Sequence, residues 1–111
     1  MSVYSRILAV VDLTHDSHSV VSRALEIAQG TSGATVTLLH VVEFVPVEPL
    51  SDSLLPAVQV EAELLERARQ KLAVLATRHG PNTPAWEVCA GNVKAEILRL
   101  ARTGGFDLIV L

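Results

Sequence analysis

The chain alternates between short continuous apolar runs and longer segments in which apolar residues recur at helical spacing. Residues 7–11 are all apolar, as in a strand that is buried on both faces of a parallel sheet. Residues 34–42 form a second run that is rich in β-branched side chains, which favours another strand. Between the two runs, apolar residues return every three or four positions over residues 20–28, and this spacing predicts a helix.

The second half of the chain repeats this alternation. Residues 58–75 carry one apolar stripe and predict a helix, and residues 84–90 alternate as in a strand near a sheet edge. A helix over 93–101 and a fourth strand over 106–111 follow. The resulting order of strands and helices predicts an α/β fold with a parallel sheet, right-handed crossovers and helices on both faces.

One long connection interrupts the pattern. Residues 43–57 contain Pro46, Pro49 and Pro56, which makes a regular element there improbable. A connection of this length inside a domain is typical of a lid, a binding loop or a disordered segment, so we expect it to be mobile.

Composition narrows the function classes. The 111 residues allow a single domain spanning 1–111, and a hydrophobic fraction of 50% argues against intrinsic disorder. No stretch approaches 18 consecutive apolar residues, so we expect no membrane-spanning helix. Nine basic against 12 acidic residues argue against nucleic acid as a partner. The absence of a secretory signal pattern at the N-terminus predicts a cytoplasmic protein.

Asp12 holds the most interesting position, because it ends the first predicted strand. Open α/β sheets bind ligands beyond the carboxyl ends of their strands, where the strand order reverses. A carboxylate at this point could accept hydrogen bonds from a ribose hydroxyl or an adenine amine. Equally, it could only cap the turn that follows, and the sequence pattern leaves both alternatives open. Asp16 or Ser17 is expected to cap the next helix.

The remaining chemistry-bearing residues favour structural roles. His40 lies in an apolar strand and is expected to be a hydrogen-bonded core residue. Cys89 has no partner for an intrachain disulfide, and we interpret it as an inert buried thiol. His15 and His18 lack the further ligands that a zinc site needs, so no metal site is predicted. The pair at 91–92 is interpreted as a turn and helix cap rather than as an anion site.

Four segments resemble the universal stress protein family. Residues 7–14, 38–42, 91–98 and 107–110 read ILAVVDLT, LLHVV, GNVKAEIL and DLIV, in the order and spacing of that family. The resemblance implies a Rossmann-like, flavodoxin-type three-layer sandwich with parallel strands in the order 3-2-1-4-5. It also implies a cytoplasmic, homodimeric stress-response protein. One branch of the family binds ATP or AMP, and another branch does not.

For the nucleotide-binding branch, the resemblance implies that Asp12 holds the nucleoside and that Val10 and Val11, just before it, line the same pocket. It also implies that Val41 packs on adenine and contacts it through its backbone. The sequence departs from the family at Leu13, where many nucleotide binders have glycine. It also lacks the G-x2-G-x9-G-[ST] phosphate loop, the last helix and the fifth strand. We therefore expect the domain to be incomplete, so that the natural chain continues for roughly 30–40 residues.

Two functions follow from these observations. The first is a binding module for an adenine nucleotide, ATP or AMP, in stress response. The alternative is a dimeric stress protein that binds no nucleotide and acts through protein contacts. An enzyme is not predicted, because no general base, Mg²⁺ ligand pair or nucleophile can be identified in the sequence.

Overall fold

The structure is a computed structural model that describes residues 4–43, 57–78 and 83–111. Along the chain, the elements are β1 (Arg6–Val10), α1 (Ser17–Gln29), β2 (Thr35–Val42), α2 (Ala57–Thr77), β3 (Ala85–Ala90), α3 (Val93–Thr103) and β4 (Leu108–Val110). Every predicted strand and helix is present, in the predicted order. The expectation of a mobile connection at 43–57 concerns residues 44–56, which lie outside the described residues.

The four strands form one parallel sheet in the order β3-β2-β1-β4. The first strand of the chain is therefore central, and Ile7 pairs with Val36 on one side and with Leu108 on the other. This confirms the predicted α/β fold and its 3-2-1-4 strand order. β3 lies at one edge, as the alternating pattern of its sequence predicted.

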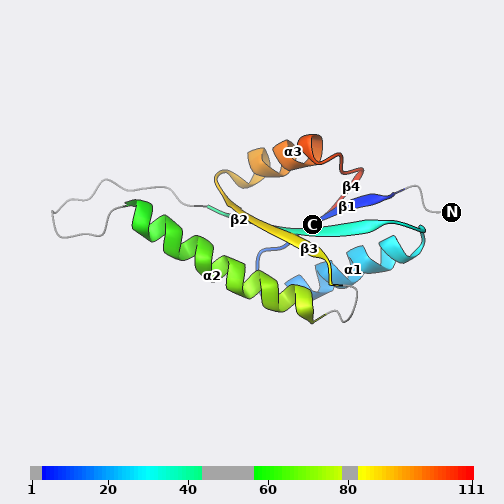
Figure 1. Cartoon of the computed structure of the whole chain (residues 1–111), viewed down its shortest axis with the longest axis horizontal. Helices are drawn as coiled ribbons and strands as arrows, with labels where there is room; N and C mark the ends of the chain where they lie inside the picture. The colour runs from blue at the N-terminus through cyan, green and yellow to red at the C-terminus, as the bar shows by residue number, and fades with distance from the viewer. Residues whose placement is uncertain (1–3, 44–56, 79–82) are drawn as a thin grey trace.

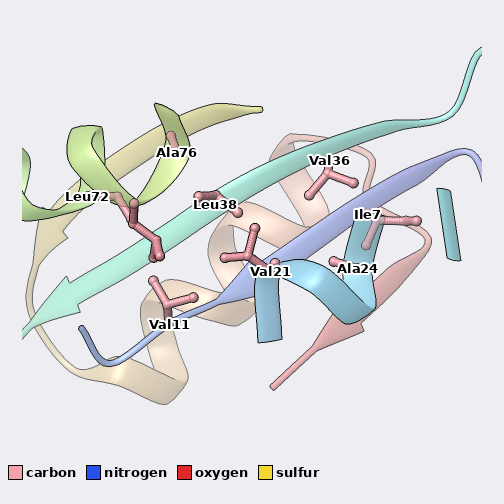
Figure 2. Close-up of a cluster of buried hydrophobic side chains, with 10 residues drawn as sticks. Ile7, Val11, Val21, Ala24, Val36, Leu38, Leu72 and Ala76 are labelled. Atoms are coloured by element: carbon pink, nitrogen blue, oxygen red, sulfur yellow. The ribbon is translucent and has the colours of Figure 1, made fainter. Parts of the chain in front are cut away.

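Helices α1 and α2 cover one face of the sheet, and α3 lies on the other (Figure 1). Beneath α1 and α2, inward side chains of β1 and β2 pack with Val21 and Ala24 of α1 and with Leu72 and Ala76 of α2 (Figure 2). All four of these helix residues are fully buried. A core built from aliphatic side chains accounts for the low aromatic content of 4%.

The opposite face carries a smaller core. Leu8, Leu39 and Val41 are buried there, and α3 covers them with Val93 and Ile97 among others. Asn92 begins α3, because its side-chain oxygen accepts a hydrogen bond of 3.0 Å from the N–H of Ala95. The side chains of β1 thus alternate between two apolar layers, which is why its sequence is continuously apolar.

The described helices were also compared with the length and hydropathy of membrane spans. None of them is long and apolar enough to cross a bilayer.

Candidate functional site

The topology places one crevice at the carboxyl ends of β1 and β2. From β1 the chain crosses to β2 on one side, and β4 returns on the other side of β1. The reversal of strand order at β1 is the position at which open α/β sheets bind ligands. The loop after β1 and the end of β2 therefore define the candidate site.

A cavity of about 270 Å³ occupies this position. Val10, Val11, Asp12 and Val41, the four site residues predicted from the sequence, all line it. Three of the four are apolar, so the cavity has largely hydrophobic walls, and Asp16 lines it as a second carboxylate beside Asp12. The structure thus brings the predicted residues together, while their contact with a ligand stays a prediction.

Asp12 is held by the loop that follows it. Its Oδ1 accepts hydrogen bonds from the hydroxyl of Thr14 at 2.7 Å, from the N–H of Thr14 at 3.0 Å and from the hydroxyl of Ser17 at 3.1 Å. These bonds lower the pKa of Asp12 below its ordinary value, and the bond from the Thr14 hydroxyl contributes most. Within the described part of the chain Oδ2 has no hydrogen-bond partner. Asp12 therefore caps the turn with one oxygen and keeps the other for a donor.

This arrangement corrects the predicted cap of α1. Asp16 stands at the N-cap position, but its side chain makes no capping hydrogen bond. Ser17 is already the first residue of α1, and its hydroxyl donates to Asp12. The hydroxyls of Thr14 and Ser17 both donate to the carboxylate of Asp12, because a charged acceptor forms stronger hydrogen bonds than a neutral one.

Leu13 adopts a backbone φ of +62°, the left-handed region that leucine rarely occupies. The Cβ of an L-residue crowds its own carbonyl there, and glycine avoids this cost. In this chain the tight turn after β1 is therefore made by a residue with a side chain, and that side chain packs against the core beneath α1 and α2.

His40 also lines the cavity, although it was not among the predicted site residues. Its Nδ1 lies 2.7 Å from the carbonyl oxygen of Val11. Because a carbonyl only accepts, Nδ1 must carry the hydrogen. This bond confirms the expected hydrogen bond of the histidine and ties the end of β2 to the end of β1. The expectation of a core position is wrong, because His40 is only half-buried and faces the cavity. A polar ring one residue before Val41 was the sequence signal for its place in the site.

The backbone of Val41 faces the cavity side of β2. Leu39 points its carbonyl at β1, where it accepts from the N–H of Val11 at 2.9 Å, and Val42 points its carbonyl at β3, where it accepts from Gly91. The N–H and C=O of one strand residue point to the same neighbour, and successive residues alternate. Val41 therefore directs both groups toward β1, beyond the point at which that strand has ended.

The cysteine lies outside this cavity. Cys89 packs under α3 on β3 but is only half-buried, so the expectation of a buried thiol is met only in part. Burial, together with the nearby carboxylate of Glu96, raises the pKa of its thiol. Among the described residues, no group of three or more histidine, cysteine or acidic side chains could hold a metal ion.

Comparison with known proteins assigns the chain to a family. Residues 3–111 match the model of the universal stress protein family. This chain belongs to the universal stress protein family. Within the family, the universal stress protein A homolog 1 of Coxiella burnetii (strain RSA 493 / Nine Mile phase I) is 32% identical over 109 residues. The match covers 97% of this chain and 75% of that relative.

Solved structures of universal stress proteins share the architecture. One from Burkholderia pseudomallei has a TM-score of 0.70 and 25% identity, and the match covers 98% of this chain and 81% of that one. A universal stress protein in complex with cAMP has a TM-score of 0.59 and 18% identity, over 99% of this chain and 77% of that one. At that identity the second likeness concerns the fold alone.

Proposed function

We propose that this universal stress protein is an adenine-nucleotide-binding module that holds ATP or AMP at the carboxyl ends of β1 and β2. The observation that carries the proposal is that Val10, Val11, Asp12 and Val41 line one cavity at the switch point of the sheet. The cavity, at about 270 Å³, is slightly smaller than typical drug-sized sites. It suits a base and ribose, with the phosphates extending outside.

The backbone of Val41 supplies the choice of base in this proposal. Its N–H is a donor and its C=O is an acceptor, and both point past the end of β1. Adenine presents an acceptor at N1 next to a donor at its 6-amino group, which matches this pair. Guanine presents a donor and an acceptor in the reverse order. A buried backbone group that loses its partner is costly, so the site should discriminate between the two bases.

Asp12 supplies the contact to the sugar. Its Oδ1 is committed to Thr14 and Ser17, which fixes the plane of the carboxylate. Its Oδ2 is then a preorganised acceptor for a ribose hydroxyl. The group is ionised at neutral pH, since even the ordinary pKa of an aspartate lies well below 7 and that of Asp12 is lower, and hydrogen bonds to an ionised acceptor are the stronger ones.

The proposal describes binding rather than catalysis. The hydroxyls of Thr14 and Ser17 both donate to Asp12, so neither is arranged as a nucleophile beside a base. The cAMP complex of another family member supports an adenine nucleotide as the ligand class. A single cysteine with no disulfide partner suits the reducing cytoplasm, where we place the protein.

Calorimetric titration of the 111-residue chain with ATP, AMP and GMP tests this proposal. We expect ATP and AMP to bind with similar affinity, because the assigned contacts all reach the nucleoside, and GMP to bind at least about tenfold more weakly. Asp12→Asn keeps an acceptor for the turn but places an amide NH₂ toward the ribose, so binding should fall by roughly tenfold or more.

Glu26→Gln is the matched control, since it removes one exposed carboxylate on α1 beyond the lining of the cavity. It should leave binding unchanged. No heat with either adenine nucleotide would refute the proposal. Equal losses in Asp12→Asn and Glu26→Gln would refute the assignment of Asp12.

A second candidate function is a homodimer that acts through protein contacts. It is supported by an apolar groove of about 620 Å³ between α3 and the carboxyl ends of β1 and β4, lined by Val93, Ile97 and Ile109 among others. Leu98 is 44% exposed at this groove. Sedimentation equilibrium should then show a species of twice 11.9 kDa that Leu98→Asp dissociates. A monomer at all concentrations would refute this candidate.

A further inference from the structure

A second cavity lies behind the Asp12 loop, on the side of the sheet that α1 and α2 cover. Its volume is about 350 Å³, and it opens between the start of α1 and the last turns of α2. Asp12 faces the first cavity, whereas the next residue, Leu13, lines the second. We call the second one the α1–α2 cavity. The left-handed backbone at Leu13 separates the two.

The floor of the α1–α2 cavity is apolar. Leu13 and Leu75 contribute side chains that also belong to the core layer beneath the helices. Val74 lines the cavity as well and is 55% exposed, although its neighbours on the inner side of α2 are buried. An apolar side chain left open in a concavity favours the binding of an apolar group.

The rim of the α1–α2 cavity is cationic. Lys71 and Arg78 line it on either side of Val74, seven positions apart and thus about 10 Å along a helix axis. Neither forms an ion pair with any acidic residue that the structure describes. The chain as a whole has a net charge of −3, whereas this rim carries two cations with no ion-pair partner among the described residues. They would attract an acidic group to the rim.

We propose that the α1–α2 cavity is a second ligand site, which binds a small amphipathic anion. The ligand has an apolar body, aromatic or aliphatic, that lies on Leu13, Val74 and Leu75, and a carboxylate or similar acidic group that Lys71 and Arg78 bind. The hydroxyls of Thr14 and Ser17 form the fixed wall, because both are held by Asp12. This site does not depend on nucleotide binding in the first cavity.

The test uses the fluorescent probe 1-anilinonaphthalene-8-sulfonate, which joins an aromatic body to a sulfonate. The double variant Lys71→Gln/Arg78→Gln should weaken saturable binding of the probe by at least about fivefold. The control is Lys94→Gln/Arg102→Gln on α3, where Lys94 lines the other apolar groove. Both doubles change the net charge by the same amount, so the control should bind within about twofold of the parent.

Three results would overturn the proposal: no saturable binding, equal weakening in both double variants, or weakening only in the α3 control. Val74→Glu gives an independent variant, because it places a carboxylate on the floor and should abolish binding. Circular dichroism checks that each variant is folded.

Displacement of the probe identifies the body of the ligand. Decanoate and 1-naphthoate are compared, each with its uncharged methyl ester. Displacement by either acid, and not by its ester, supports the site and shows whether an aliphatic or an aromatic body is preferred. Equal displacement by acid and ester would refute the role of Lys71 and Arg78.

Discussion

Leu72 anchors α2 above the candidate site, and its truncation is the sharpest test of the core. The side chain is fully buried and reaches from α2 toward Val11, which precedes Asp12 (Figure 2). Replacing Leu72 by alanine removes the contacts of the outer part of the side chain and leaves a cavity behind the end of β1. We expect loss of stability together with a looser candidate site.

The magnitude follows from the burial of the side chain. A fully buried leucine that is truncated to alanine costs about 2–5 kcal/mol. For 111 residues, an unfolding entropy of about 2.1 cal/mol/K per residue gives about 0.23 kcal/mol/K. Each kcal/mol therefore lowers Tm by about 4 °C. Leu72→Ala should lower it by about 9–21 °C.

Thermal and urea unfolding followed by circular dichroism measure this loss. Val74→Ala is the matched control, because Val74 lies two residues away on the same helix and is 55% exposed. Its change should stay within about 0.5 kcal/mol, since alanine also favours a helix. Similar losses in the two variants would refute the assignment of Leu72 to the core and of Val74 to the surface.

Three further predictions concern single side chains. Backbone N–H bonds from Ser5 and Arg6 lower the pKa of Asp107. The contribution of Asp107 to stability is therefore complete above its unfolded pKa and is lost as the pH falls through the folded pKa. Asp107→Asn should reduce the fall in unfolding free energy at acid pH, measured by urea unfolding at several pH values, and an unchanged pH dependence would contradict this. Asn92→Ala should cost about 1 kcal/mol in urea unfolding by removing the cap of α3, and a change under about 0.3 kcal/mol would contradict this. Burial raises the pKa of Cys89, so at pH 7.5 iodoacetamide should alkylate Cys89 several times more slowly than it alkylates the thiol of free glutathione. Mass spectrometry measures both rates, and equal rates would count against burial of the thiol.

The fold was predictable because its signals are local and strong. The continuous apolar run of β1 has few alternatives to a strand covered on both faces, and Asn92 is a good helix cap by its residue type alone. The exposure of Trp86 was less evident. It shares the apolar side of this alternating strand with Val88, yet it is 37% exposed near the start of β3 at the sheet edge. Coverage at an edge depends on how far α2 extends, which periodicity does not encode.

The site was predictable in its position but not in its hydrogen bonds. Strand ends and topology suffice to gather Val10, Val11, Asp12 and Val41 in one place. The partners of Asp12 were missed because Thr14, Asp16 and Ser17 are all plausible caps, and the choice among them depends on the turn made by Leu13. No rule of composition or spacing predicts a leucine in a left-handed conformation.

The central position of β1 in the sheet has a consequence for folding during synthesis on the ribosome. Ile7 pairs with Leu108, 101 positions later, so one side of the first strand has no partner until almost all of these residues have been made. At about 5–20 residues per second, synthesis leaves that edge open for roughly 5–20 s. During this interval β1 exposes unpaired backbone beside its most apolar side chains, a template for wrong pairing. Nascent chains of this topology are therefore expected to need chaperones more than the finished sheet does.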